Sequence, residues 1–136
     1  MTENTSKSLP RITEDAAPYW EGLRNNELCY QTCTKCGASI FPPRYICPYC
    51  LSSELEWQKS IGRGKIYSFS TLYRAPYEAL KDKLPYTVAI IELDEGFFMF
   101  SEVVECSPSQ IEIDMPVEVV FHKVNEEVTL PKFRPI

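Results

Sequence analysis

Two Cys-x-x-Cys pairs limit the possible folds of this chain more than any other feature. Cys33 and Cys36 form the first pair, Cys47 and Cys50 form the second, and ten residues lie between the pairs. Each pair makes a tight turn that directs two sulfurs to one point, and a short hairpin brings the two turns together as a tetrahedral metal ion requires. Gly37 suits the sharp backbone turn after the first pair because it has no Cβ. The spacing predicts a four-cysteine metal site in a small ribbon.

Two disulfides and a rubredoxin-type iron site are the alternatives for these four cysteines. Disulfides need an oxidising compartment. The first ten residues are polar and contain no apolar stretch typical of a signal peptide or membrane span. Iron also accepts four thiolates, but the short spacer favours a zinc ribbon. We therefore expect a cytoplasmic protein with one Zn²⁺, which is structural because four thiolates leave no position for water.

Composition and charge restrict the partners. The chain has 136 residues, of which 44% are hydrophobic, so a compact core in one or two small domains is expected. Its formal net charge is −5, whereas binding to a phosphate backbone needs a basic face. We expect neither a nucleic acid nor a membrane as partner.

The chain divides into three parts. Residues 1–26 are expected to form an N-terminal helical segment, residues 27–60 the zinc ribbon, and residues 61–136 a β-domain. In the first part, a helix over 15–25 places Tyr19, Trp20 and Leu23 on one side. That side packs either on the body of the protein or on a partner, and the sequence favours neither. In the ribbon, Leu28 and Tyr30 share one strand face and Cys29 alternates to the other, as a small buried side chain outside the metal spacing.

The last part reads as five strands, over 65–73, 86–93, 97–105, 116–124 and 130–134. In the first of them, Ile66, Ser68, Ser70 and Leu72 alternate against Tyr67, Phe69, Thr71 and Tyr73. Asp94-Glu95-Gly96 predicts a hairpin turn between the second and third strands. Residues 74–85 predict a helical insertion, with its apolar residues at Tyr77, Leu80 and Leu84. The fold class is therefore mainly β: an N-terminal helix, a rubredoxin-like zinc ribbon, and a five-stranded OB-fold barrel rather than a fragment of a sandwich.

With these elements in place, the chain resembles the zinc-ribbon/OB-fold acyl-CoA-associated proteins, the small accessory subunits of thiolase-like enzymes. The resemblance covers nearly the whole chain. Besides the four cysteines, it rests on Tyr19-Trp20-Glu21-Gly22-Leu23, Phe41-Pro42-Pro43-Arg44, Gly62-Arg63-Gly64, Pro85-Tyr86-Thr87-Val88-Ala89, Leu93-Asp94-Glu95-Gly96, Met115-Pro116-Val117-Glu118-Val119 and Leu130-Pro131-Lys132-Phe133-Arg134-Pro135.

The sequence departs from the family pattern at two places. Members often carry glycine where this chain has Asp114, which affects only a local turn. Many members have a polar or basic residue shortly after the hairpin glycine, where this chain has Phe97-Phe98-Met99-Phe100. The resemblance implies a non-catalytic accessory subunit that supports the assembly of a heteromeric acyl-CoA enzyme with a thiolase, thiolase-like aldolase, synthase or hydratase partner. It also implies that the protein helps to hold or pass the acyl-CoA.

The residues themselves support a non-catalytic role. His122 is the one histidine, and a lone strand histidine is more often packed or solvated than a general base. Cys29 and Cys106 lie in no recognisable nucleophile motif, and Glu102 and Glu105 read as solvated carboxylates. The alternative function is a single-stranded nucleic-acid-binding zinc-ribbon/OB module, in which Tyr67, Phe69 and Tyr73 would stack on bases.

The partner-contact and acyl-CoA residues are predicted from chemistry alone. Large exposed apolar groups mark interfaces, so we expect partner contacts from the apolar residues of the insertion and of the strand after the hairpin. Arginine binds the phosphates of CoA well, which points to three arginines in or near the ribbon and the barrel entry. The predicted contact residues are Tyr77, Leu80, Leu84, Phe97, Phe98, Arg44, Arg63 and Arg74.

Overall fold

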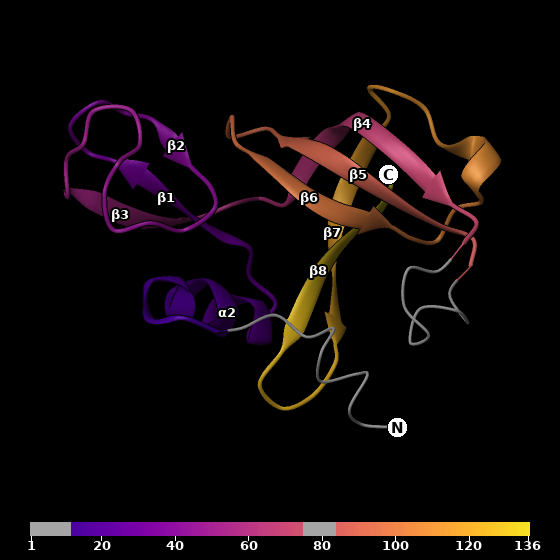
Figure 1. The fold of residues 1–136 in the computed structure, drawn as a ribbon, viewed down its shortest axis with the longest axis horizontal. Coiled ribbons are helices and arrows are strands. Elements are labelled where there is room, and N and C mark those ends of the chain that lie inside the picture. Colours follow the sequence, from indigo (N-terminus) through magenta and orange to yellow (C-terminus); the bar gives the residue numbers. More distant parts are fainter. Residues whose placement is uncertain (1–11, 75–83) are drawn as a thin grey trace.

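The computed structural model describes residues 12–74 and 84–136 (Figure 1). It contains an N-terminal helix, a three-stranded ribbon and a closed five-stranded barrel, so the predicted fold class is confirmed. Of the predicted helical insertion, Tyr77 and Leu80 lie outside the described residues, and Leu84 is half-buried. No helix among the described residues is long and apolar enough to cross a membrane.

The ribbon is an antiparallel sheet in the order β2-β1-β3. Its strands are β1 (Cys29–Cys33), β2 (Ser39–Ile40) and β3 (Leu55–Lys59). Leu28 and Tyr30 are buried, as their shared strand face predicts. Cys29, expected to be buried, is only half-buried; its sulfur lies on the opposite face of the strand, close to Gly22 in the N-terminal helix.

The barrel closes in the order β4-β5-β6-β8-β7. The strands are β4 (Arg63–Leu72), β5 (Tyr86–Leu93), β6 (Phe98–Val103), β7 (Pro116–Lys123) and β8 (Thr129–Pro135), and a short 3-10 helix, η3 (Pro108–Gln110), lies between β6 and β7. β7 pairs with the start of β4, and β6 pairs in parallel with β8 at Val103 and Phe133. Ile66, Ile91, Val117 and Phe133 are completely buried inside the barrel.

A bulge in β4 changes the predicted alternation. The pairing register between β4 and β5 shifts between Ile66 and Ser68. An extra residue in one strand turns the following side chains to the other face. Tyr67 and Ser68 are therefore both exposed, and Phe69 packs against the core instead. The prediction that Ser68 shares a face with Ile66 is wrong for this reason.

The hairpin between β5 and β6 forms where the sequence predicts it, with Gly96 at φ 96°. Asp114, at the position where family members often carry glycine, has φ 67°. Aspartate tolerates this left-handed backbone better than most residues. The turn before β7 is thus formed in spite of the missing glycine.

Phe97 lies in the core, and its prediction as a surface contact is wrong. Its side chain is 2% exposed, and its ring stacks on Tyr30 with centroids 4.6 Å apart. Phe41 from the ribbon linker lies 5.6 Å from the same ring. Because side chains alternate along a strand, Phe98 and Phe100 point outward instead and are 44% and 70% exposed.

Polar contacts also join the ribbon to the barrel, through Glu95 at the tip of the β5–β6 hairpin. Figure 1 shows this turn reaching toward the ribbon. The Glu95 carboxylate accepts hydrogen bonds from Ser60 Oγ and the Ile61 N–H, both at 2.8 Å. Its carbonyl oxygen accepts from Ser39 Oγ in β2, also at 2.8 Å. The hairpin is therefore hydrogen-bonded both to β2 and to residues 60–61, which connect the ribbon to the barrel.

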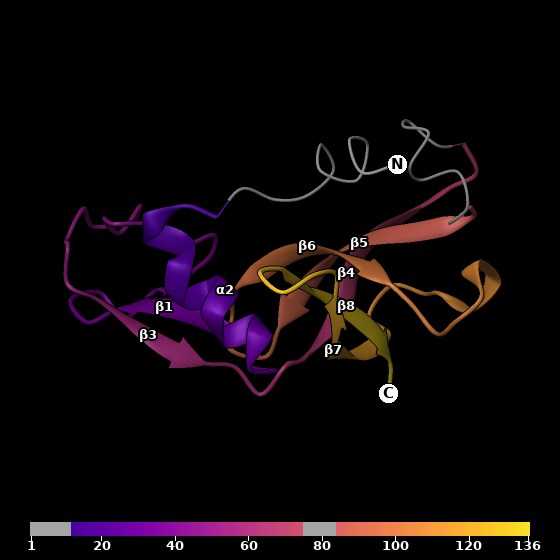
Figure 2. The same cartoon turned by 90° about the horizontal axis from the view of Figure 1, so that it is seen from below.

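The N-terminal helix docks on the protein itself. A 3-10 turn, η1 (Glu14–Ala16), leads into α2 (Ala17–Arg24), with proline in its first turn. Tyr19 and Leu23 are 6% and 0% exposed and join the main core. α2 contacts β1 of the ribbon and β8 of the barrel (Figure 2). Of the two alternatives left open by the sequence, packing on the body of the protein is confirmed.

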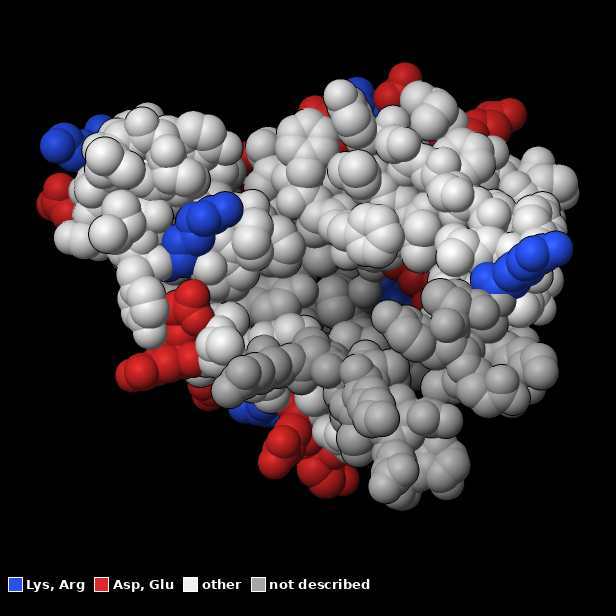
Figure 3. All heavy atoms as spheres, viewed as in Figure 1, with Lys and Arg blue, Asp and Glu red and all other residues white. Residues whose placement is uncertain are grey.

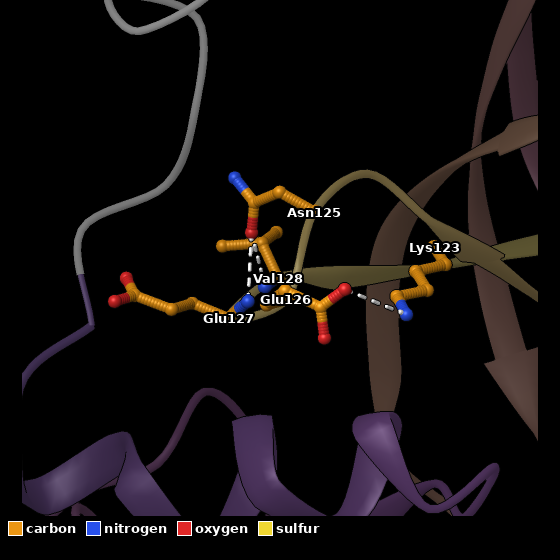
Figure 4. Close-up of polar contacts among 5 residues, drawn as sticks. All are labelled: Lys123, Asn125, Glu126, Glu127 and Val128. Carbon is orange, nitrogen blue, oxygen red and sulfur yellow. Dashed lines mark hydrogen bonds and ion pairs between the residues drawn. The ribbon is translucent and has the colours of Figure 1, made fainter.

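The β7–β8 turn, whose internal polar contacts Figure 4 shows, also holds the end of α2. Asn125 Oδ1 accepts hydrogen bonds from the N–H groups of Glu127 and Val128, both at 2.8 Å. This side-chain bond fixes the turn, and Lys123 contacts Glu126 at 3.3 Å beside it. The Glu127 carbonyl accepts from Arg24 Nη1 at 3.0 Å. The turn thus ties the helix to the barrel.

Replacing Gly64 with alanine is expected to destabilise the protein by about 1–3 kcal/mol. A Cβ at this position would collide with the carbonyl oxygen of Glu92 on β5, which is backbone and cannot rotate away. Ser68→Ala is the matched control, since Ser68 lies exposed on the same strand. Urea unfolding of both variants measures the effect. A Gly64→Ala variant as stable as Ser68→Ala would contradict the close approach of β4 and β5.

Candidate metal centre and exposed surfaces

The four predicted cysteines form one cluster, in which all sulfurs lie within 4.8 Å of one another. Cys33 Sγ is 3.5 Å from Cys50 Sγ, and Cys36 Sγ is 3.7 Å from Cys47 Sγ. Zn–S bonds of ~2.3 Å in a tetrahedron place sulfurs about 3.8 Å apart. The donor set and its spacing therefore fit one structural zinc ion, as the sequence predicts.

Two similar turns, or knuckles, present these sulfurs. In the first, the Gly37 N–H donates to the Cys33 carbonyl at 2.8 Å; in the second, the Leu51 N–H donates to the Cys47 carbonyl at 2.9 Å. Backbone N–H groups also point at the sulfurs, from Cys36 to Cys33 at 3.5 Å and from Tyr49 to Cys47 at 3.4 Å. Such bonds stabilise thiolate over thiol. The Cys36 N–H bond, helped by one from Lys35, outweighs burial and lowers the pKa of Cys33 to about 7.

The other candidate reactive groups lie apart from this cluster. Among the described residues, the four cysteines are the only group of three or more Cys, His, Asp or Glu side chains close enough to share a metal ion. His122 is exposed on β7. Burial, together with the nearby Glu27 carboxylate, raises the pKa of Cys29, so its thiol stays protonated. The half-buried Cys106 thiol contacts the carbonyl of Ser107 at 3.3 Å.

The three predicted arginines are exposed but do not converge. Arg63 begins β4, and Arg74 follows its end, so about 30 Å of strand separates them at ~3.3 Å per residue. Arg44 lies in the ribbon linker, where Gln31 holds its backbone by two hydrogen bonds. Lys65 is already paired with Glu92 and Asp114. The described residues thus place Arg63 and Arg74 at separate points rather than in one phosphate site.

An exposed apolar surface lies on the outside of the barrel. The barrel patch consists of Tyr67, Ile90, Phe98 and Phe100, which are 56%, 38%, 44% and 70% exposed. Ile90 pairs with Phe100 across β5 and β6, and the Tyr67 and Phe98 rings meet edge to face at 5.1 Å. Among the described residues, most charged atoms in Figure 3 lie toward the edges of the face shown. Of the aromatic residues considered for base stacking, Tyr67 and Tyr73 are exposed, whereas Phe69 packs on the core.

A cavity of about 280 Å³ opens beside the barrel patch and was not anticipated from the sequence. α2 contributes Trp20, and the barrel contributes Phe100 and a buried ion pair. Lys132 Nζ lies 3.1 Å from a Glu102 carboxylate oxygen, with side chains only 10% and 22% exposed. The expectation that Glu102 is a solvated carboxylate is therefore wrong. β6 and β8 bring the two residues together, and no local sequence pattern signals that pairing.

A second group of exposed apolar side chains lies in the second knuckle and just before it. The knuckle patch consists of Tyr45, Ile46, Tyr49 and Leu51, which are 64%, 51%, 73% and 77% exposed. The sequence analysis used only the cysteine spacing here. A run of nine residues without charge, 45–53, is the signal that could have identified this patch.

Family models match most of the chain. Residues 20–56 match the model described as "ChsH2, rubredoxin-like zinc ribbon domain", and residues 57–122 match "ChsH2, C-terminal OB-fold domain". Both descriptions agree with the ribbon and barrel seen in the structure.

Several known proteins are similar in sequence. A DUF35 domain-containing scaffold protein from Methanothermobacter thermautotrophicus is 47% identical over 96 residues, covering 70% of this chain and 71% of that protein. A probable enoyl-CoA hydratase alpha subunit from Thermomonospora curvata is 35% identical over 138 residues; the match covers 99% of this chain but only 43% of that protein. The benzoylsuccinyl-CoA thiolase subunit BbsA from Thauera aromatica is 33% identical over 118 residues, covering 87% of this chain and 74% of that subunit.

Solved structures of DUF35 proteins are also similar to this chain. A chain of the structure described as "Ltp2-ChsH2(DUF35) aldolase" superposes with a TM-score of 0.83 at 35% identity, covering 93% of this chain and 98% of that chain. A DUF35 protein of unknown function from Sulfolobus solfataricus has a TM-score of 0.67 at 14% identity over 97% of this chain and 92% of that chain, which shows the shared fold alone. The chain therefore belongs to the ChsH2/DUF35 family of proteins with a rubredoxin-like zinc ribbon followed by an OB-fold domain.

Proposed function

We propose that this chain is a non-catalytic accessory subunit of a heteromeric acyl-CoA enzyme, with a thiolase or thiolase-like aldolase as its partner. The structural match to the Ltp2-ChsH2(DUF35) aldolase carries this proposal, since it covers 98% of the matched chain. The thiolase-subunit and hydratase-subunit names of two relatives support the same acyl-CoA context.

The chemistry of the described residues supports the non-catalytic part of the proposal. Four thiolates saturate a tetrahedral zinc ion, so the metal has no position for water or substrate. Cys29 has a raised pKa and is a poor nucleophile at neutral pH. The partner would supply the reacting groups, and this chain would support assembly.

The barrel patch is the docking surface that we propose for the partner. Its four side chains are large, apolar and contiguous across neighbouring strands. Burying such a patch contributes about 25 cal/mol for each Å² of apolar surface removed from water. Phe98 remains part of this proposal, and Phe100 replaces the buried Phe97. Tyr77, Leu80 and Leu84 of the predicted insertion remain proposed contacts as well.

We further propose that acyl-CoA binds at the interface between this chain and its partner. The cavity beside Phe100 adjoins the barrel patch, so docking there would place the partner next to it. Arg63 and Arg74 lie at opposite ends of β4, too far apart to share one phosphate, and we propose that each of the three arginines contributes at most a single contact. The partner's residues would complete the CoA site.

Replacing Tyr67, Phe98 and Phe100 together with serine is expected to weaken partner binding at least tenfold. All three side chains are exposed, so zinc content and thermal stability should stay close to wild type. Affinity purification with quantification of the thiolase-fold subunit by mass spectrometry measures the binding. Ile113→Ser is the control, because Ile113 is 55% exposed and lies outside the patch. Full recovery of the enzyme subunit with the triple variant would refute the docking surface.

A further inference from the structure

β4 has a neighbouring strand on both sides only near its start. There, β7 pairs with residues 63–65 of β4. Ile66 also forms hydrogen bonds on this side: its N–H donates to the Met115 carbonyl at 3.1 Å, and its carbonyl accepts from the Asp114 N–H at 2.7 Å. From residue 67 to residue 72, β5 is the only strand paired with β4 among the described parts of the chain. The other side of this half of β4 is therefore an open sheet edge.

The hydrogen bonds of β5 show which backbone groups of β4 point to this edge. In antiparallel strands, opposite residues alternate between pairs that exchange hydrogen bonds and pairs whose N–H and C=O groups point away from each other. Leu93 of β5 donates its N–H to the Phe97 carbonyl at 2.9 Å, away from β4. Every second residue of β5, counted back from Leu93, therefore directs its backbone groups away from β4 as well. Phe69 and Thr71 of β4 lie opposite two of these residues. Their N–H and C=O groups, four in all, consequently point to the open edge, and none of them has a hydrogen-bond partner in the part of the chain that the structure describes.

This edge carries few of the features that prevent strands from pairing with other chains. Charged side chains and prolines commonly protect an open edge, whereas residues 68–72 contain no charge, proline or glycine. The side chains of Ser68 and Ser70 are exposed. The bulge at Tyr67 limits the regular edge to the five residues that follow it. Unpaired N–H and C=O groups along an open edge bind another extended strand.

We propose that two copies of this chain pair in antiparallel fashion through β4, with Ser70 at the two-fold axis. An interface between identical copies must be complementary to itself. Phe69 and Thr71 flank Ser70, so this register places Phe69 of one copy opposite Thr71 of the other. Four hydrogen bonds between the copies then use all the unpaired groups at both edges. The other opposite pairs are Ser70 with Ser70 and Ser68 with Leu72, so no like charges meet.

A second copy also extends the barrel patch, which a strand from another protein does not. The two-fold axis of an antiparallel strand pair is perpendicular to the sheet, so the outer faces of both barrels point to the same side. Tyr67 belongs to the barrel patch and lies at the start of the open edge, where its ring meets that of Phe98. Pairing through β4 therefore brings the two barrel patches side by side across the axis. This dimer does not depend on the proposed accessory role.

Disulfide trapping of Ser70→Cys tests the register directly. In the proposed dimer, the two residues at position 70 form a pair without backbone hydrogen bonds, with Cα atoms about 4.5 Å apart. A disulfide spans roughly 4.4–6.8 Å between Cα atoms. Oxidised glutathione should therefore link two chains through position 70, as seen on non-reducing gels and by mass spectrometry of the linked peptide.

Ser68→Cys is the matched control for disulfide trapping, because Ser68 is exposed on the same strand. The two positions 68 are offset by four residues in this register, which is about 13 Å at ~3.3 Å per residue, too far for a disulfide. Links through position 70 and none through position 68 are expected. Equal linking at both positions, or no link at position 70, would overturn the proposal. A link from position 70 to another protein from the lysate, in place of a second copy, would overturn it as well.

Charge substitutions at Ser70 test the dimer without covalent trapping. Ser70→Asp and Ser70→Lys each place two like charges at the axis, so each should raise the dimer dissociation constant at least tenfold in sedimentation velocity. An equimolar mixture of the two variants should dimerise again, and the neutral Ser70→Ala should dimerise as wild type. Because Ser70 is exposed, all three variants should fold. A wild-type chain that stays monomeric, or a mixture that does not dimerise, would overturn the proposal. A monomeric chain that still retains the enzyme subunit on affinity purification would leave the accessory role standing.

Discussion

Cys47→Ser is expected to abolish zinc binding and unfold the ribbon. Cys47 is fully buried, and its sulfur lies 3.7 Å from that of Cys36. Serine is a much poorer zinc ligand than a thiolate, and a site with three thiolates would have to fill its fourth position with water, which binds the metal more weakly than a thiolate does. Structural zinc in small domains supplies on the order of 10 kcal/mol of apparent binding free energy, which is also folding free energy. Elemental analysis of zinc and far-UV circular dichroism measure the two losses.

Cys106→Ser is the matched control for this change. Cys106 is a half-buried cysteine outside the cluster, so its variant should retain one zinc per chain and a folded ribbon. Chelation of zinc from the wild-type protein should reproduce the Cys47→Ser spectrum. A Cys47→Ser protein that keeps stoichiometric zinc would show that the four sulfurs are not the zinc site.

Phe97→Ala is expected to lower stability by about 3–5 kcal/mol, the usual cost of removing a buried phenylalanine ring. The ring stacks on Tyr30 of the ribbon and lies close to Phe41 in the linker. Its removal leaves a cavity where the barrel meets the ribbon and exposes both neighbours. A change of this size should lower the melting temperature by about 10 °C or more. Differential scanning calorimetry measures the shift.

Phe100→Ala is the matched control. It removes the same aromatic ring from an outward-facing position three residues further along the chain. Phe100 is 70% exposed, so its truncation should change stability by no more than about 0.5 kcal/mol. The contrast between the two variants is the informative result. Similar melting temperatures for both would contradict the assignment of Phe97 to the core and Phe100 to the surface.

The sequence predicts best those features that depend on neighbouring residues. The cysteine spacing determines the zinc site, because each knuckle is formed within a few residues. The turn at Gly96 predicts the β5–β6 hairpin for the same reason. The five-stranded barrel was predictable because, in each strand, the alternation of inward and outward side chains can be read from neighbouring residues.

Features that depend on distant contacts were not predictable. Phe97 points inward because its ring packs on Tyr30 and Phe41. Both lie in the ribbon, far from Phe97 in the sequence. The docking of α2 depends on barrel and ribbon residues far along the chain. The bulge at Tyr67 reverses a local pattern that looked regular. The exact boundaries near residues 26 and 60 stay predictions.

Affinity purification of the tagged chain from native lysate tests the accessory role most directly. The bound proteins are identified by mass spectrometry and quantified relative to the bait. The account predicts a thiolase-fold enzyme subunit in near-stoichiometric amount, with acyl-CoA activity in the complex and none in the isolated chain. Recovery of nucleic acid that dissociates with salt, without any such enzyme, would contradict the account and favour the single-stranded nucleic-acid-binding alternative.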